Sequence, residues 1–290
     1  TATRIDMEIG HAMADGDASR AAALAEQSLP HLMAAMGIDD DFVTMWPPLV
    51  EAALATGDVA LTVRLMAPVE TAPASIVSPG VRAHWLRLRG RLGALRGDDP
   101  ATVEADLRAG IAELDAYGAV GYRARAQEEL GRWLISQGRG AEATPLLDEA
   151  RATYEEIGAI LAAAARLFRD HGYEQVKMEA IAAAAEVSIG TIYNYYQNKG
   201  DLLMAIVAME VNEVLAAGEK VIARPPRSAD RAIDTLIGNY IEHSLVYLSK
   251  EMWRQAMAIS TQQPDSPFGM TYADLDLRLA DHGLQQVLAV

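Results

Sequence analysis

The stretch from residue 160 to residue 207, ILAAAARLFRDHGYEQVKMEAIAAAAEVSIGTIYNYYQNKGDLLMAIV, decides the fold of its part of the chain. Its apolar residues recur at helical spacing, so that Ile160, Ala164 and Phe168 fall on one face of a first helix. Gly172 predicts the end of that helix, because glycine readily adopts the left-handed backbone of a helix C-terminus. The pattern indicates a module of short helices.

Three more helices are expected beyond the first. The second runs roughly from residue 178 to residue 185. Ser188 can cap a third helix through its side-chain oxygen, and that helix is expected to run to about Tyr196. Asn198 can cap a fourth, longer helix, with Asp201 favourably placed near the positive end of the helix dipole. The second and third helices, joined by a tight turn, have the pattern of a helix-turn-helix.

The outer face of the third helix carries residue types that read DNA. Such a helix fits the major groove, where an asparagine can form two hydrogen bonds with an adenine edge. Asn194 is the candidate for that contact, while Ile189 and the Thr191 methyl group suit thymine methyl groups. Tyr193 and Lys199 suit phosphates, which fix register without reading sequence. The full set of candidate DNA contacts is Lys177, Ser188, Ile189, Gly190, Thr191, Tyr193, Asn194, Tyr195 and Lys199.

Small, apolar and aromatic residues recur in a dense order between residues 163 and 203. They are Ala163-Ala164, Leu167-Phe168, Gly172-Tyr173, Ile181-Ala182, Val187-Ser188, Gly190-Thr191-Ile192-Tyr193, Tyr195-Tyr196, Lys199 and Leu202-Leu203. This run resembles the DNA-binding domain of the TetR family of transcriptional regulators. An ordinary alanine-rich bundle is the alternative, but a bundle has no reason for the order Gly-Thr-Ile-Tyr-x-Tyr-Tyr. Ile192 and Tyr196 are expected to face the core.

The resemblance implies an all-α protein that binds a double-stranded DNA operator. It also implies that the helices after the DNA-binding domain enclose a small-molecule effector pocket and that the last two form a homodimer interface. This chain looks too short to hold that last pair. The candidate pocket residues, for which ordinary bundle core is the alternative, are Met204, Tyr240, His243, Tyr247, Trp253 and Met257.

Three positions depart from the family pattern. The turn of the helix-turn-helix usually holds glycine where this chain has Glu186, and a left-handed backbone there would cost about 1–2 kcal/mol more than with glycine. Val176-Lys177 stand where a serine or threonine usually caps the second helix. Glu155-Glu156 replace the basic arm that often leads into the first helix, and their charges would repel phosphate.

Length and composition exclude several classes of protein. With 290 residues, two domains are expected, each long enough to bury a core. The absence of cysteine excludes disulfides and cysteine-based metal or redox chemistry. The sequence has no long apolar run and no signal peptide, which predicts a cytoplasmic protein without a membrane partner. A net charge of −15, with four basic against five acidic residues in 158–207, restricts DNA binding to a local face.

Composition also changes along the chain. Residues 1–157 contain 14 arginines but no lysine or asparagine, whereas residues 158–290 contain 4 lysines, 7 arginines and 4 asparagines. We interpret this change as a junction near Gly158 between two sequences of different origin. The expected domains are a repeat domain in 1–157, the DNA-binding domain in 158–207 and a partial effector and dimerisation bundle in 208–290. Gly158 either caps a helix there or lies within one, at a cost of roughly 1 kcal/mol relative to alanine.

The first segment contains an internal repeat. Gly-Asp or a similar turn recurs at residues 16, 57, 97 and 138, with an apolar helix before each turn and a second helix after it. Such hairpins cover their apolar faces by stacking, which predicts a helical solenoid. The last unit resembles a tetratricopeptide repeat, which implies a protein-interaction module and a protein partner. Trp46, Trp85 and Trp133 are expected in the stacking core. The arginines on one helix, Arg82, Arg87, Arg89, Arg91 and Arg96, are expected on a solvated face that pairs with acids.

No motif of an enzyme, a metal site or a cofactor site occurs in the sequence, so we expect none of these. The preferred interpretation is a TetR-like, effector-responsive DNA-binding repressor behind tetratricopeptide-like repeats. An interaction scaffold is the first alternative. An artificial fusion in which the truncated regulator no longer binds DNA is the second, and the missing initiator methionine favours it.

Overall fold

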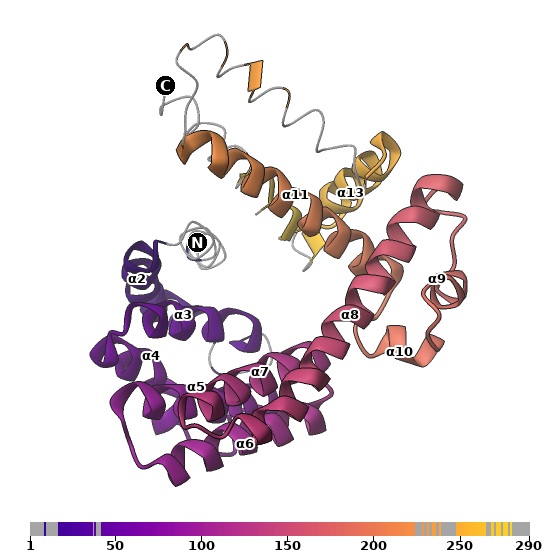
Figure 1. The fold of residues 1–290 in the computed structure, drawn as a ribbon. Helices are drawn as coiled ribbons and strands as arrows, with labels where there is room; N and C mark the ends of the chain where they lie inside the picture. Colours follow the sequence, from indigo (N-terminus) through magenta and orange to yellow (C-terminus); the bar gives the residue numbers. More distant parts are fainter. Residues whose placement is uncertain are drawn as a thin grey trace. The chain divides into compact units, whose positions relative to one another are not determined.

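The computed structural model describes residues 17–36, 42–223 and 248–264, together with single positions outside these ranges (Figure 1). The described residues form helices and connecting turns without a strand, so the predicted all-α class is confirmed. None of the described helices is both long and apolar enough to cross a membrane. The chain divides into two compact units, Thr1–Glu155 and Glu156–Val290, which we call unit 1 and unit 2.

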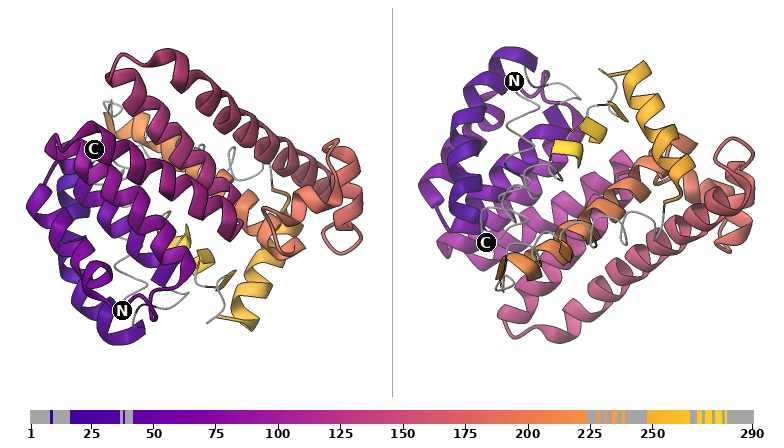
Figure 2. Two further views of the ribbon diagram at one scale, coloured as in Figure 1. Left: turned by 90° about the horizontal axis from the view of Figure 1, so that it is seen from below. Right: turned by 90° about the horizontal axis from the view of Figure 1, so that it is seen from above.

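Unit 1 is a stack of antiparallel helices in which each helix packs on its neighbour in sequence, and α2, α3 and α5 also pack on the next helix but one (Figure 2). Gly57 and Gly97 adopt left-handed backbones at the turns that end two of these helices, with φ of 74° and 73°. The expected turns therefore separate helices at these positions. The helices are α2 (Ala18–Met36), α3 (Phe42–Thr56), α4 (Val59–Thr71), α5 (Pro79–Arg96), α6 (Pro100–Tyr117), α7 (Val120–Ser136) and the first half of α8 (Gly140–His171).

Helices α5 and α6 form the most extensive contact between two helices of unit 1. Glycines permit this close approach, since a Cβ atom on Gly110 would lie 2.8 Å from the backbone nitrogen of Arg87. Trp46 is fully buried beside them in the core of α2 to α5, where its indole nitrogen donates a hydrogen bond to the Leu65 carbonyl (2.8 Å). The expectation for Trp46 is confirmed, whereas Trp85 and Trp133 are only half-buried.

The arginine-rich face of α5 is only partly the solvated surface that the sequence predicts, because Arg82 and Arg96 are exposed but Arg87 is not. Arg87 is fully buried, and its guanidinium bridges Glu51 of α3 and Glu129 of α7. Arg125 also pairs with Glu51 (2.6 Å), and Arg91 pairs with Glu129 (3.1 Å). The prediction of pairing with acids is confirmed, but the prediction of solvation is wrong for Arg87. Gly90 allows α6 to approach this part of α5 closely, and Leu88 is fully buried in the core. Arg87, which lies between these contacts, is therefore shielded from solvent.

A histidine lies next to this buried network. His84 is 1% exposed, and its ring packs edge-on against Tyr122 with centroids 4.5 Å apart. Burial, followed by the positive charges of Arg87 and Arg125, lowers the pKa of His84 from 6.5 to about 3. His84 is therefore neutral in the folded protein at neutral pH.

We expect unit 1 to lose stability as the pH falls below 6.5, the ordinary pKa of histidine. Because the pKa of His84 is depressed by folding, the unfolded chain binds the proton first. The free energy of unfolding then decreases by up to about 1.4 kcal/mol for each pH unit. Urea unfolding over a pH series measures this dependence. His84→Phe, which keeps an aromatic ring at this position, should flatten it, and an equally steep dependence in that variant would contradict the assignment.

Unit 2 contains the second half of α8 together with α9 (Met178–Ala184), α10 (Ile189–Tyr193), α11 (Lys199–Ala223) and α13 (Lys250–Gln262). Gly158 lies inside α8 rather than capping it, so the helix is continuous through the boundary between the units. Of the partial bundle expected in 208–290, residues 224–247 and 265–290 lie largely outside the described residues. Leu248 itself is not helical, and Ser249 caps α13 instead.

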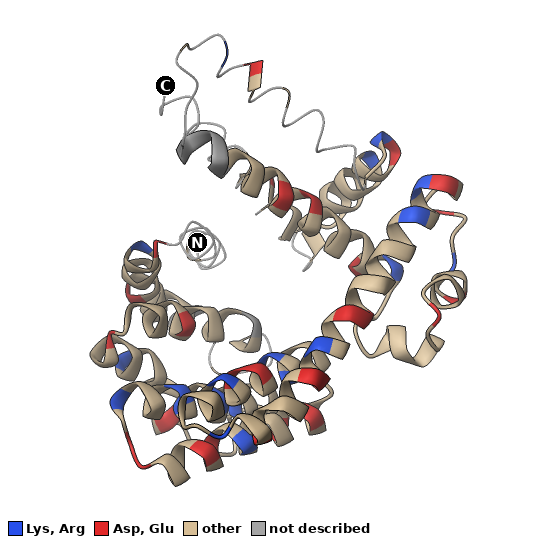
Figure 3. Cartoon of the chain, in the orientation of Figure 1, with Lys and Arg blue, Asp and Glu red and all other residues tan. Residues whose placement is uncertain are grey.

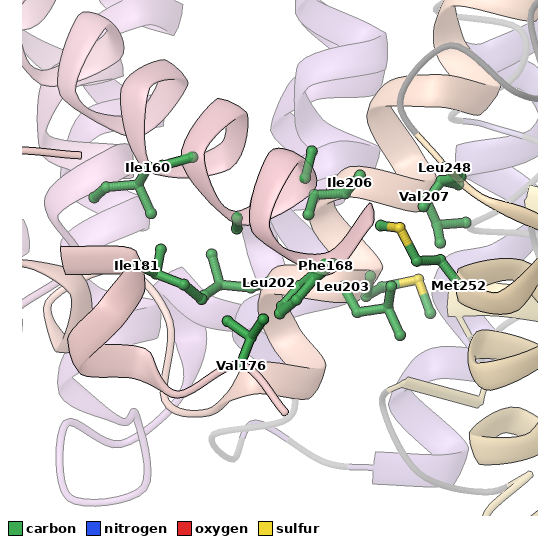
Figure 4. Packing of buried hydrophobic residues seen from close by; sticks show 14 of the residues in the cluster. Ile160, Phe168, Val176, Ile181, Leu202, Leu203, Ile206, Val207, Leu248 and Met252 are labelled. Carbon is green, nitrogen blue, oxygen red and sulfur yellow. The ribbon is translucent and has the colours of Figure 1, made fainter. Parts of the chain in front are cut away.

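The core of unit 2 joins α8, α9, α10, α11 and α13 (Figure 4). Phe168 lies at its centre with 1% exposure and contacts the ring of Tyr173 at a centroid distance of 5.2 Å. Ile181 of α9, Ile192 of α10 and Leu202 of α11 are fully buried against the same core. The apolar positions that define the sequence pattern therefore hold the short helices on α8 and α11.

Candidate DNA-binding surface

Helices α9 and α10, with the turn between them, form a compact pair. Ser188 caps α10, because its hydroxyl oxygen accepts a hydrogen bond from the Thr191 amide (3.0 Å). Ile192 is fully buried, and its side chain holds α10 against the core of unit 2. The helix ends at Tyr193, earlier than the expected end near Tyr196. The Tyr195 amide donates to the Ile192 carbonyl three residues earlier, and the Gln197 amide donates to the Asp201 carboxylate (2.9 Å) instead of continuing the helix.

The turn before α10 contains a strained residue. Glu186, which stands where the family pattern usually has glycine, has a φ of 58° and so a left-handed backbone. Its amide and that of Val187 donate to the carbonyls of Ala183 and Ala182, which closes the end of α9. A residue with a side chain therefore adopts a backbone conformation that favours glycine.

Glu186→Gly should raise the free energy of unfolding by about 0.5–1 kcal/mol. A left-handed residue with a side chain costs about 1–2 kcal/mol, and glycine recovers this at an entropic cost of about 0.5–1 kcal/mol. Urea unfolding provides the measurement. Glu186→Gln is the matched control, because it removes the same charge but keeps the strained backbone, and an equal gain from both variants would show that charge rather than backbone geometry is responsible.

The outward side of α10 presents several of the candidate DNA contacts together. Ser188, Gly190 and Asn194 are exposed, and the Tyr193 side chain is 52% exposed. Ile189 and Thr191 lie half-buried on the same helix, and the Thr191 and Ser188 hydroxyl groups are 2.9 Å apart. Lys177 is exposed at the start of α9. These are the predicted residues that remain accessible to a ligand.

Tyr195 and Lys199, two further candidate contacts, are engaged within unit 2. Tyr195 is half-buried, and its hydroxyl group donates to the carboxylate of Glu156 on α8. Lys199 donates to backbone carbonyls of the loop before α9. The Tyr195 hydroxyl is therefore directed toward α8, and its contact with DNA stays a prediction. Sequence reasoning also missed Glu156 as a partner of this face.

Charges around α10 are sparse and of mixed sign. Helix α10 itself carries no charged residue, and Lys177, Glu179 and Glu186 lie near it along the chain (Figure 3). All three of these side chains are exposed. Any affinity of this surface for DNA must therefore come from few cations. We expect the DNA affinity to depend only weakly on salt concentration.

The geometry defines a class of protein module: a capped, exposed short helix held on a buried core by a preceding short helix and a tight turn is a helix-turn-helix. Residues 160–206 match the model of the family described as "Bacterial regulatory proteins, tetR family". No solved structure matches the chain significantly.

Curated relatives match a part of the chain. The HTH-type transcriptional repressor KstR of Rhodococcus jostii is 37% identical over 67 residues, which cover 23% of this chain and 32% of the repressor. The uncharacterized HTH-type transcriptional regulators Mb1581 of Mycobacterium bovis and Rv1556 of Mycobacterium tuberculosis are each 30% identical over 77 residues, which cover 27% of this chain and 34% of each relative. This chain therefore spans about a third of the length of these relatives.

The candidate effector pocket is only partly described. Met204 is buried and Trp253 is half-buried in the core of unit 2, whereas Met257 is 55% exposed. Tyr240, His243 and Tyr247 lie outside the described residues. Within the described part of the chain, no group of three or more histidine and acidic side chains is arranged to hold a metal ion.

Proposed function

We propose that this protein is a DNA-binding transcriptional regulator in which α10 enters the major groove of an operator. The exposed Tyr193 and Asn194 above the buried Ile192 support this proposal most strongly, because they give one helix a polar outer face and an apolar anchor. The similarity of residues 160–206 to TetR-type regulators supports the same function.

Gly190 provides independent support. It lies on the exposed side of α10, and a Cβ atom there would meet only the Ser188 oxygen, at 3.6 Å. The fold therefore does not require glycine at this position, although glycine inside a helix costs about 0.5–1 kcal/mol relative to alanine. A surface that must approach DNA closely accounts for a residue without a side chain.

We further propose that the regulator acts as a repressor, responds to an apolar small molecule and binds DNA as a homodimer. Repression is taken from the similarity to KstR, and the other two properties from the TetR resemblance. Unit 1 is proposed to be the tetratricopeptide-like part that binds a protein partner. Two cavities, of about 300 and 520 Å³, open on its helices and favour a scaffold role as the second candidate function.

Gly190→Ala should separate folding from function. The variant should be more stable by about 0.5–1 kcal/mol, since alanine favours the helix, yet bind DNA more weakly because its methyl group occupies the approach surface. Urea unfolding measures the first effect, and a gel shift with random-sequence duplex DNA at low and moderate salt measures the second.

Gln262→Ala is the control for DNA binding, because Gln262 is exposed at the end of α13, outside the helix-turn-helix. It should leave the shift unchanged. A wild-type protein that gives no salt-sensitive shift would contradict the regulator function and leave the scaffold as the better candidate.

A further inference from the structure

The ammonium group of Lys199 is enclosed by backbone oxygens. It donates to the carbonyls of Tyr173 (2.7 Å), Glu174 (3.3 Å) and Val176 (3.2 Å), and it lies 4.3 Å from the centroid of the Tyr173 ring. A lysine ammonium has three donor hydrogens, so these carbonyls use its full capacity. A phosphate could bind it only by displacing one of them.

The three carbonyls belong to one segment, residues 172–177, which connects α8 to α9. Outside a helix, their oxygens depend on partners such as Lys199. The same segment is attached to α13, because the Gln255 side chain donates to the Glu174 carboxylate (3.0 Å). Lys199 at the start of α11 and Gln255 of α13 therefore both hold the 172–177 loop.

The loop ends at Lys177, the exposed cation nearest the start of α9. The carbonyl of Val176 belongs to the same planar peptide group as the Lys177 nitrogen. A hydrogen bond that fixes this carbonyl therefore also fixes the direction in which the Lys177 backbone continues. The Val176 side chain, 5% exposed, anchors the other side of the peptide group in the core.

We propose that Lys199 is a positioning residue for DNA binding, which holds the 172–177 loop so that Lys177 faces the phosphates, and that Lys199 itself is not a phosphate ligand. This inference rests on the proposed DNA-binding function. It differs from the interpretation of the sequence, in which both lysines contact DNA directly.

The dependence of DNA affinity on salt, compared between single variants and the double variant, separates the two roles. Each phosphate contact contributes about 0.9 to the slope of log K against log salt. With random-sequence duplex DNA, Lys177→Gln should make this slope shallower by about 0.9. Lys199→Met should weaken binding by about tenfold and make the slope shallower by up to about 0.9, because the displaced loop takes Lys177 from its phosphate. In the double variant of Lys177→Gln and Lys199→Met, the slope should fall no further than in Lys177→Gln alone. A slope that falls by about 1.8 in the double variant, the sum of two independent phosphate contacts, would overturn the proposal.

A second variant and a second measurement keep the test decisive. Lys199→Gln removes the charge but keeps two N–H donors for the carbonyls, so it should bind more tightly than Lys199→Met, with a slope close to that of the wild type. A slope shallower by about 0.9 in Lys199→Gln, equal to the loss expected of Lys177→Gln, would contradict the proposal. Amide hydrogen exchange in free protein should show faster exchange in residues 172–177 of Lys199→Met. Unaltered exchange there overturns the loop role even if the wild type binds no DNA, whereas absence of DNA binding with faster exchange refutes only the proposed function.

Discussion

Arg87→Met should lower the free energy of unfolding of unit 1 by about 3–5 kcal/mol. The guanidinium of Arg87 is fully buried between the carboxylates of Glu51 and Glu129. Methionine fills part of the volume but leaves these carboxylates without their central partner, in a place from which water is largely excluded. Arg91 and Arg125 remain beside them, so we expect a large loss of stability rather than complete unfolding. Urea unfolding followed by circular dichroism measures the loss.

Arg82→Met is the matched control on the same helix. Arg82 pairs with Glu113 at 3.2 Å, but its side chain is 61% exposed. Exposed pairs contribute about 0–1 kcal/mol, so this variant should change stability by no more than that. Similar losses in Arg82→Met and Arg87→Met would show that the buried network has no special role.

Phe168→Ala should destabilise unit 2 by about 3–5 kcal/mol. The Phe168 ring is 1% exposed and lies between α8 and the helices that it supports, in contact with Tyr173 and the apolar residues of α11 (Figure 4). Its removal leaves a cavity that the backbone can fill only by moving α9 and α10 from their positions. DNA binding should therefore be lost together with stability, as urea unfolding and the gel shift would show.

Tyr193→Ala is the complementary variant. The Tyr193 side chain is 52% exposed on the outer side of α10, so its removal should change the free energy of unfolding by less than about 0.5 kcal/mol. DNA binding should nevertheless weaken. If Phe168→Ala keeps full stability, or if Tyr193→Ala loses as much stability as Phe168→Ala, the division into core and binding face is incorrect.

Much of the helix-turn-helix could be predicted because its signals are local. Ser188 caps its own helix, and the reciprocal bonds between Asn198 and Asp201 start α11 as expected. The left-handed turn at Glu186 stands where the family pattern has glycine, and it too is closed by bonds to nearby carbonyls. In each case, the partner lies within a few residues of the chain, where helix geometry determines which groups meet.

Residues whose roles depend on distant partners could not be predicted. Tyr195 meets Glu156, 39 positions earlier, and Lys199 meets a loop more than 20 positions earlier. Arg87 is buried because α3 and α7 supply carboxylates at that level of the stack, which a charge pattern on one helix does not reveal. The same pattern of arginines suits a solvated face and a buried network equally well.

Contact between the outer side of α10 and DNA is the central element of the proposed function. A photo-reactive phenylalanine analogue placed at Tyr193 tests this contact directly, with the same analogue at Met257 of α13 as an equally exposed control. After irradiation with random-sequence duplex DNA at low salt, we expect cross-linked DNA from position 193 and little from position 257. Cross-linking from position 257 but not from position 193 would contradict the proposed role of α10.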